Sequence, residues 1–395
     1  MVHVFVVNDR TFRYHLEYMF AGTCASSDPL FIEDVNYNNP SSKKQGLTSR
    51  QERTIAEMIA DVSRIRIDDK ILFYVKQSKY HEGMFFGVFR VCENPFFDSH
   101  RNNYLSQELG VNLNFRVLIE PDQVFQFGIS EREALDSLEE ISHPSQMCWS
   151  MIYRKLKAKR GCTMIMDQES DRLIRLLRQR NNNVELNGRG YSFNCIENRI
   201  ELKNESPLYE GTKTSIDIKD RMLVLSSRDK AFETHLQAFI LQNCDRNPQL
   251  IELIALSPDK PLWIGNEVSC GFGMQSIDIL LIGESDDNVT IKIIELKYKI
   301  PSAQIIKDQI PWYIKWVDQY VAPNYSKRVI IKPIIIAAKF RRMSKTQTDF
   351  YDEMMNFNSN LPVNNNSEMA ELEYINFEID SKNQSISFHK NDISI

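Results

Sequence analysis

The chain has 395 residues and a net charge of −5, with 42% hydrophobic and 26% charged residues. This length suits two or three domains with cores of their own, and the composition is that of a globular protein, not of a disordered or fibrous one. No apolar stretch approaches the ~20 residues that span a membrane, and the N-terminus lacks a signal-peptide pattern. We therefore expect a cytoplasmic protein with no membrane partner.

The cysteines and histidines give no metal-binding pattern. Seven cysteines are scattered without a C-x-x-C pair, which argues against a disulfide framework and against a zinc ribbon. The seven histidines are equally dispersed. Any metal ion would therefore be held by carboxylates.

The first part of the chain mixes strand and helix patterns, which predicts an α+β fold class. We expect strands at 3–7, 70–76, 84–91 and 115–120, and helices at 12–19, 131–141 and 168–180. A polar loop rich in Asn and Ser occupies residues 26–51. We assign residues 1–183 to one domain.

A segment of mixed character follows this domain. Residues 184–228 alternate polar and apolar side chains in short bursts at 192–195, 199–202 and 222–225, which predicts a connecting β segment or a linker. We place the domain boundary inside this segment and assign residues 229–395 to a second domain.

A basic cluster near residue 157 is a candidate nucleic-acid contact. It includes Lys155, Lys157, Lys159 and Arg160. Local patches of charge steer polyanions even when the net charge is negative. A solvated helix face explains the same cluster equally well.

Two β-branched, apolar runs in the second domain predict a hairpin. They are Ser276–Ile282 and Ile291–Lys297, separated by a polar turn at 283–288. Side chains alternate across a strand, so Glu295 and Lys297 share one face, and an antiparallel partner could bring Asp278 beside them. Two acids and an amine among apolar residues are costly unless they serve chemistry, and a divalent cation with a scissile phosphate fits them best. A solvated acid–base pair is the alternative explanation.

Helical patterns flank this hairpin. The segment 230–242 has helical apolar spacing, with Glu233 beside the apolar face. The segment 303–320 places Gln309 and Tyr313 four residues apart, on one face of a helix. Tyr313 is equally explained as a core residue.

The order of these elements resembles the PD-(D/E)xK nuclease superfamily, and within it the C-terminal domain of NucS-type, DUF91-like endonucleases. The shared pattern is a helix with Glu, N-P-x-L-I, G-x-x-x-I-D-I-L, I-I-E-L-K, Q-x-x-x-Y and an apolar strand. These motifs stand at Glu233, Asn247, Gly273, Asp278, Glu295, Lys297, Gln309, Tyr313 and Ile334–Ala338. The resemblance covers roughly residues 229–340, and it implies a mixed sheet with flanking helices.

This chain departs from the superfamily pattern at two points. Residues 257–263 read as an inserted loop, and Glu267 is an alternative to Glu233 as the helical acid. We prefer Glu233, because its helix opens the domain.

The resemblance implies a role for each matched residue. Asp278, Glu295 and the Leu296 carbonyl would hold Mg²⁺ or Mn²⁺. Lys297 would orient or deprotonate the attacking water and stabilise the transition state. Glu233 would bind a second metal ion or a metal-bound water. Gln309 would position backbone or water, and Tyr313 would contact the DNA backbone.

The first domain resembles an EVE domain of the PUA/YTH group, which implies a β-barrel with flanking helices. The segments that carry this resemblance are 67–76, 83–91, 95–98, 115–121 and 160–163. Such domains place a flipped or unpaired base in an aromatic-lined pocket. Candidate pocket residues are Asn8, Tyr74, Phe97, Asp98 and Trp149. A core position is the competing explanation for each of them.

A base-reading domain fused to a metal-dependent nuclease predicts a modification-dependent DNA endonuclease of the restriction type. The alternatives are a NucS-like repair endonuclease acting on mismatched or branched DNA, and a nucleic-acid binding protein with an inactive nuclease fold. Double-strand cutting by one site per chain would imply a homodimer.

Overall fold

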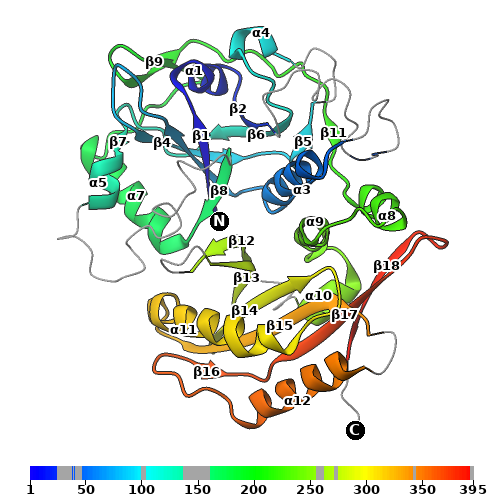
Figure 1. Cartoon of the computed structure of the whole chain (residues 1–395). Helices are drawn as coiled ribbons and strands as arrows, with labels where there is room; N and C mark the ends of the chain where they lie inside the picture. The colour runs from blue at the N-terminus through cyan, green and yellow to red at the C-terminus, as the bar shows by residue number, and fades with distance from the viewer. Residues whose placement is uncertain are drawn as a thin grey trace. The chain divides into compact units, whose positions relative to one another are not determined.

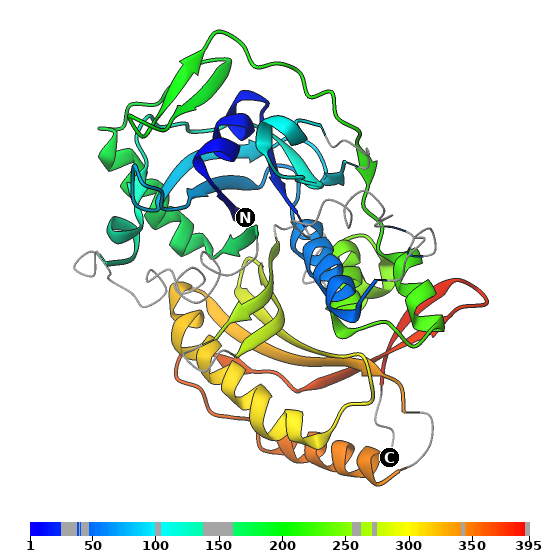
Figure 2. The same cartoon turned by 45° about the horizontal axis from the view of Figure 1, so that its top comes forward.

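A computed structural model describes residues 1–24, 38, 40, 47–98, 104–136, 161–254, 262–270, 275–340 and 344–391. The fold is α+β, which confirms the class expected from the sequence. The chain forms two compact units, one of Met1–Tyr37 with Ser42–Ile216, and the other of Asn38–Ser41 with Asp217–Ile395. Figures 1 and 2 show their elements. Within the described ranges, no helix has the length and apolar character to cross a bilayer.

Unit 1 is built on a curled, half-barrel sheet. Its described strands follow the order β11-β5-β6-β4-β3-β1-β8, with β2 paired to β6 and β7 paired to β4. Strands β1 and β3 are parallel, and the other pairs are antiparallel. The strands are β1 (Val2–Val7), β2 (Phe20–Thr23), β3 (Lys70–Val75), β4 (Met84–Val91), β5 (Phe96–Phe97), β6 (Phe115–Pro121), β7 (Ile129–Ser130), β8 (Cys162–Ile165) and β11 (Thr214–Ser215).

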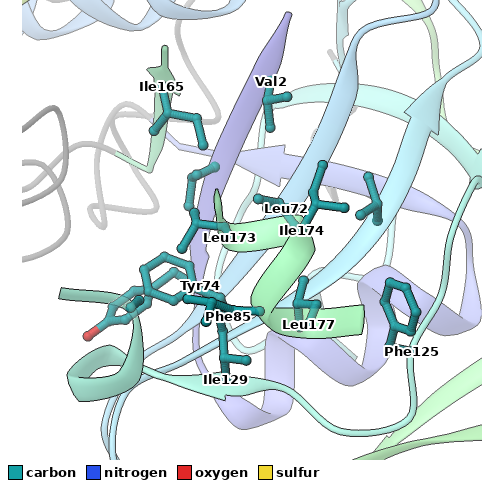
Figure 3. Close-up of a cluster of buried hydrophobic side chains, with 14 residues drawn as sticks. Val2, Leu72, Tyr74, Phe85, Phe125, Ile129, Ile165, Leu173, Ile174 and Leu177 are labelled. Atoms are coloured by element: carbon teal, nitrogen blue, oxygen red, sulfur yellow. The ribbon is translucent and has the colours of Figure 1, made fainter. Parts of the chain in front are cut away.

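Helix α7 closes one part of the core of unit 1. Figure 3 shows Leu173, Ile174 and Leu177 of this helix among the strand residues Leu72 and Phe85. Their helical spacing of one, three and four residues gives α7 a continuous apolar face. The described helices of the unit are α1 (Asp9–Glu17), α3 (Ser49–Ser63), α4 (Ser106–Leu109), α5 (Glu131–Asp136) and α7 (Asp167–Arg180).

A two-stranded sheet completes unit 1. Strands β9 (Gly190–Asn194) and β10 (Arg199–Lys203) pair antiparallel. The ring of Phe193 lies 4.9 Å from that of Phe12 in α1, centroid to centroid. Part of the segment expected to connect two domains therefore packs into the first unit.

Unit 2 contains a mixed sheet with the order β12-β13-β14-β15-β17-β18, and β16 pairs with β15. Strand β14 is antiparallel to β13 but parallel to β15, so the strand pairing changes from antiparallel to parallel at β14. The strands are β12 (Leu262–Ser269), β13 (Ser276–Glu284), β14 (Asn288–Lys297), β15 (Arg328–Ala338), β16 (Glu368–Met369), β17 (Glu373–Asp380) and β18 (Ser385–Lys390).

The helices of unit 2 pack on this sheet, and Figures 1 and 2 both show α11 running along β14 and β15. A π-helical turn, η4, leads into α11, and a 3-10 turn, η5, follows it. The described helical elements are α8 (Lys219–Ser227), α9 (Glu233–Asn243), α10 (Pro248–Ile254), η4 (Ile305–Gln309), α11 (Ile310–Tyr320), η5 (Ala322–Asn324) and α12 (Lys345–Ser359).

The expectation of a β segment at 222–225 is wrong, because these residues form the middle of α8. Met222 and Leu225 are buried together with Ile218, which precedes the helix. That spacing of three and four residues matches a helical face, not an alternating strand. The division between the units falls at Ile216 and Asp217, inside the predicted connecting segment.

One further boundary differs from expectation. Leu262 and Trp263 begin strand β12, although the sequence pattern suggests a loop there. Residues 257–261 of that loop, and 137–141 of the predicted helix at 131–141, lie outside the described residues.

Candidate active site

The antiparallel pair β13–β14 brings the two strand acids together. Ile279 pairs with Ile294, and the register therefore sets Asp278 across from Glu295. The Leu296 amide donates a hydrogen bond to Asp278 Oδ2 at 2.7 Å. Glu295 is only 2% exposed, so its charge is held away from solvent.

Lys297 joins these acids to the first turn of α9. Its Nζ donates to Glu295 Oε1 at 2.7 Å and to the Leu296 carbonyl at 2.7 Å. The same ammonium lies 3.4 Å from Oε1 of Glu233, the first residue of α9. The structure thus collects Glu233, Asp278, Glu295 and Lys297 from three elements.

The electrostatics of this cluster favour an added cation. Burial, followed by the charges of Glu295 and Glu233, raises the pKa of Asp278 well above its usual range. Burial also raises the pKa of Glu295, against the opposing effect of Lys297. Burial would lower the pKa of Lys297, but the neighbouring carboxylates outweigh it and raise that pKa. Three carboxyl groups thus lie beside a single ammonium, and a bound cation would relieve the repulsion and the burial cost that raise the pKa values of Asp278 and Glu295.

Glu267 lies on strand β12 and not on a helix. Its carboxylate accepts hydrogen bonds from Gln237 Nε2 at 3.2 Å and from Ser276 Oγ at 2.8 Å. Its charge contributes to the raised pKa of Asp278. Glu233 is therefore the acid that a helix supplies, and Glu267 is an additional acid near the same strand pair.

Tyr313 of α11 is buried and close enough to the cluster for its ionisation to be affected. Burial raises its pKa, and the charges of Glu295 and Asp278 add to that effect. Gln309 ends the π-helical turn before α11, and its buried Oε1 accepts no hydrogen bond from the described residues. Single π-helical turns inside helices are frequent at functional sites.

Trp312 and Cys270 are in contact with each other and lie near the acid cluster. Trp312 is 43% exposed, and its Nε1 donates to the Cys270 carbonyl at 3.0 Å. Burial, together with the charge of Glu295, raises the pKa of the Cys270 thiol to about 12. The thiol therefore stays protonated and is no nucleophile at neutral pH.

The donor set at Asp278, Glu295 and Leu296 fits a hard divalent cation. The Glu295 Oε2 atom is buried and accepts no hydrogen bond within the described residues. The Lys297 ammonium donates hydrogen bonds to Glu295 Oε1 and to the Leu296 carbonyl. Two of the three groups expected to bind the metal ion therefore already face one cation. In the described part of the chain, no three Asp, Glu, His or Cys side chains form a metal-holding group. The expected set has two carboxylates and a carbonyl instead.

Three of the expected base-pocket residues lie in the core of unit 1. Tyr74 is 3% exposed, and its hydroxyl donates to Glu131 Oε2 at 2.7 Å. Phe97 is buried in β5. Asp98 is fully buried, accepts the Tyr104 amide at 2.8 Å and faces Arg116 Nη1 at 3.7 Å.

Asn8, in contrast, lines a cavity of about 210 Å³ at the end of β1. Its side chain also caps α1 by accepting the Thr11 amide at 2.9 Å. Thr23, Cys24 and Lys76 contribute further polar atoms to the wall, beside apolar residues such as Leu113. Trp149 and the basic cluster of Lys155, Lys157, Lys159 and Arg160 lie outside the described residues.

Sequence reasoning missed Gln237, which donates from α9 to the Asp278 carbonyl at 2.9 Å. The only signal was its position four residues after Glu233, on the same helical face. No protein-family model matches this sequence, and comparison with curated proteins finds no similar one.

Proposed function

We propose that this chain is a metal-dependent DNA endonuclease whose first unit reads a modified base. The observation that carries the proposal is the convergence of Asp278, Glu295, Lys297 and Glu233 in one partly buried cluster. Perturbed acids and an amine in contact are typical of sites that perform proton transfer or bind metal ions.

Asp278, Glu295 and the Leu296 carbonyl would hold Mg²⁺ or Mn²⁺ at the end of the strand pair. When bound, such an ion neutralises phosphate charge and lowers the pKa of a coordinated water. The residues themselves supply rigid placement, because Asp278 is held by the Leu296 amide and Glu295 is buried in β14.

Lys297 acts as a charged donor in this proposal. Its raised pKa keeps it an ammonium at neutral pH, so it can stabilise negative charge on a phosphate oxygen and orient the attacking water. Glu233 lies beside it and sets the position of Nζ. Deprotonation of water by Lys297 is less favourable while the acids retain their charges.

Gln309 and Tyr313 support the site from α11. Gln309 has a buried acceptor oxygen available for a water molecule or a donor on the substrate. Tyr313 is 3% exposed, which favours a role in shaping the acid cluster over contact with the DNA backbone.

The cavity at Asn8 supports the base-reading half of the proposal. It combines polar wall residues such as Thr23 and Lys76 with apolar ones such as Leu113. Ligand sites are typically concave, largely apolar and equipped with a few polar groups. A flipped base carrying an extra group could be distinguished there by shape.

The proposal is tested by incubating the protein with Mg²⁺ and matched duplexes. The duplexes are unmodified, contain 5-methylcytosine or 5-hydroxymethylcytosine, or carry a mismatch. Cleavage restricted to modified DNA supports the proposal, and cleavage restricted to mismatched DNA would instead indicate a repair endonuclease. Loss of cleavage with a chelator is the control for metal dependence.

A further inference from the structure

Gln237 links the helix that carries Glu233 to the strand that carries Asp278. It lies four residues after Glu233 in α9 and is 2% exposed. Its Nε2 donates to the Asp278 carbonyl at 2.9 Å and to Glu267 Oε1 at 3.2 Å. One side-chain amide therefore contacts both strands of the β12–β13 pair.

Glu267 adopts a backbone conformation that is unusual for its residue type. Its φ is 49°, in the left-handed region that disfavours residues with a β-carbon. The register of β12 and β13 sets it across from Asp278, since Asn266 pairs with Ile279 and Val268 with Ile277. Strained residues of this kind persist where neighbours fix them, and they cluster at functional sites. Here Gln237 and Ser276 bond its two carboxylate oxygens.

The orientation of the Gln237 amide is determined by its partners. Both are oxygen acceptors, so the NH₂ group must face them, and Oε1 must be the remaining atom. That Oε1 is buried and accepts no hydrogen bond in the described part of the chain. The same holds for Glu295 Oε2. A buried acceptor normally receives a hydrogen bond from a donor. In a hydrolytic site, a water molecule is available as that donor.

We propose that Gln237 and Glu267 are positioning residues of the active site. Glu267 fixes the Gln237 amide, and Gln237 fixes the main chain at Asp278. The Oε1 atom of Gln237 accepts a hydrogen from a water molecule of the site. The inference rests on the proposed nuclease function and adds two residues that hold the metal-binding acid in place.

Three variants test the pair in the full-length chain. Gln237→Met keeps the shape of the side chain but removes its hydrogen bonds. Glu267→Gln keeps an oxygen acceptor for Gln237, replaces the oxygen that accepts from Ser276 by an NH₂ group that can donate to the Ser276 hydroxyl, and removes the charge. Glu267→Gly removes the side chain and relieves the left-handed backbone. Gln242→Met is the matched control, because Gln242 lies on the same helix and accepts the Ile218 amide at 3.2 Å.

The measurements are kcat and KM on a cleaved duplex with Mg²⁺, Mn²⁺ affinity by calorimetry without DNA, and the melting temperature. Gln237→Met should lower kcat and Mn²⁺ affinity by about 10-fold or more, with little change in KM. Glu267→Gln should retain most of the activity. Glu267→Gly should lower kcat while raising the melting temperature. Gln242→Met should leave kcat unchanged.

Two results would overturn the inference. One is a Gln237→Met protein with wild-type kcat and Mn²⁺ affinity. The other is a Glu267→Gln protein as impaired as Glu267→Gly, since the charge itself would then be needed. If Gln237→Met fails to fold, the two Glu267 variants decide the question.

Failure of the proposed function gives a different pattern. Wild-type protein that binds Mn²⁺ but cuts no duplex removes the nuclease proposal, and weaker Mn²⁺ binding by Gln237→Met then still supports the positioning pair. Wild-type protein that neither binds Mn²⁺ nor cuts DNA overturns both.

Discussion

The site contains more acidic than basic side chains. The ammonium of Lys297 bonds Glu233 and Glu295, and Glu233, Glu267 and Glu295 each contribute to the raised pKa of Asp278. Buried carboxylates without full compensation destabilise a folded protein. Their concentration at one place costs folding stability, and in the proposed function the same acids would serve metal binding.

Replacement of Lys297 by Met should lower the cleavage rate by about 100-fold or more. The variant loses the charge that would stabilise the transition state, a contribution of this order in other enzymes. The measurement is the initial rate with Mg²⁺ on the most susceptible duplex. Lys315→Met, at an exposed position of α11, is the matched control and should cut at the wild-type rate. Equal rates for Lys297→Met and wild type would contradict the proposed mechanism.

Replacement of Asp278 by Asn should stabilise the protein at neutral pH in the presence of a chelator. The folded-state pKa of Asp278 is raised above its unfolded value, so the folded state binds more protons in the interval between the two pKa values. Wild-type stability should therefore fall relative to the variant as pH rises above about 4. Unfolding by urea between pH 4 and 7 measures the difference.

The control variant is expected to change the stability of the protein in the opposite direction. The pKa of Asp380 is lowered, first by the Asn383 amide and then by the Asn383 side chain. Asp380→Asn should therefore destabilise the protein by an amount that develops as pH rises towards about 4 and then stays constant from pH 4 to 7. The same trend in both variants would contradict the assignment for Asp278.

At the level of elements, strand β14 places lysines in two different environments. Lys297 lies near its end among acids, whereas Lys292 is 6% exposed and donates to the Ile254 carbonyl at the end of α10 at 2.9 Å. Burial, followed by the charge of Lys332, lowers the pKa of Lys292 to about 8. Lys292 therefore caps the last carbonyl of α10 and links this helix to the sheet, although burying its ammonium costs desolvation free energy.

Lys292 should make stability rise with pH above 8. Its folded-state pKa is about 8 and its ordinary value is 10.5, so the unfolded state binds more protons in that interval. The wild type should therefore gain up to about 3 kcal/mol relative to Lys292→Met between pH 8 and 10.5. Chemical denaturation of both proteins across this range measures the gain. Parallel pH profiles would show that Lys292 is ordinarily solvated.

Some elements could be predicted from sequence because their patterns are local. The hairpin of β13 and β14 forms as expected, since β-branched apolar runs flank a polar turn. Helix α12 gave no comparable signal, because only Phe350, Met354 and Phe357 are buried among polar residues. The Gln237 bond to Asp278 spans 41 residues and depends on how a helix approaches a sheet, which no local pattern encodes.

For the whole molecule, the division into two units separates the two proposed activities. Unit 1 contains the cavity at Asn8, and unit 2 contains the acid cluster. The sequence indicated a boundary within 184–228, but the packing of β9 on α1 and the pairing of β11 with β5 decide where unit 1 ends. Such pairings join distant parts of the chain, and alternating patterns alone could not assign them to a unit.

Filling the cavity in unit 1 should remove selectivity without removing cleavage. Cys24→Phe places a large ring in the wall of the cavity, so modified DNA should lose its advantage over unmodified DNA. Cys92→Phe, at an exposed position, is the matched control and should retain selectivity. Competition between labelled modified and unmodified duplexes measures the ratio. Unchanged selectivity in Cys24→Phe would argue against base recognition at this cavity.

The bonds of Lys297 in the resting site also have a thermodynamic consequence. The ammonium occupies Glu295 Oε1 and the Leu296 carbonyl, two groups that a metal ion would need. A bound phosphodiester would give that ammonium a new anionic partner and release both oxygens. Nucleic acid and metal ion would then each strengthen the binding of the other by the same factor, because linkage is reciprocal. The protein alone would hold its ion weakly, and the complex with DNA would hold it tightly.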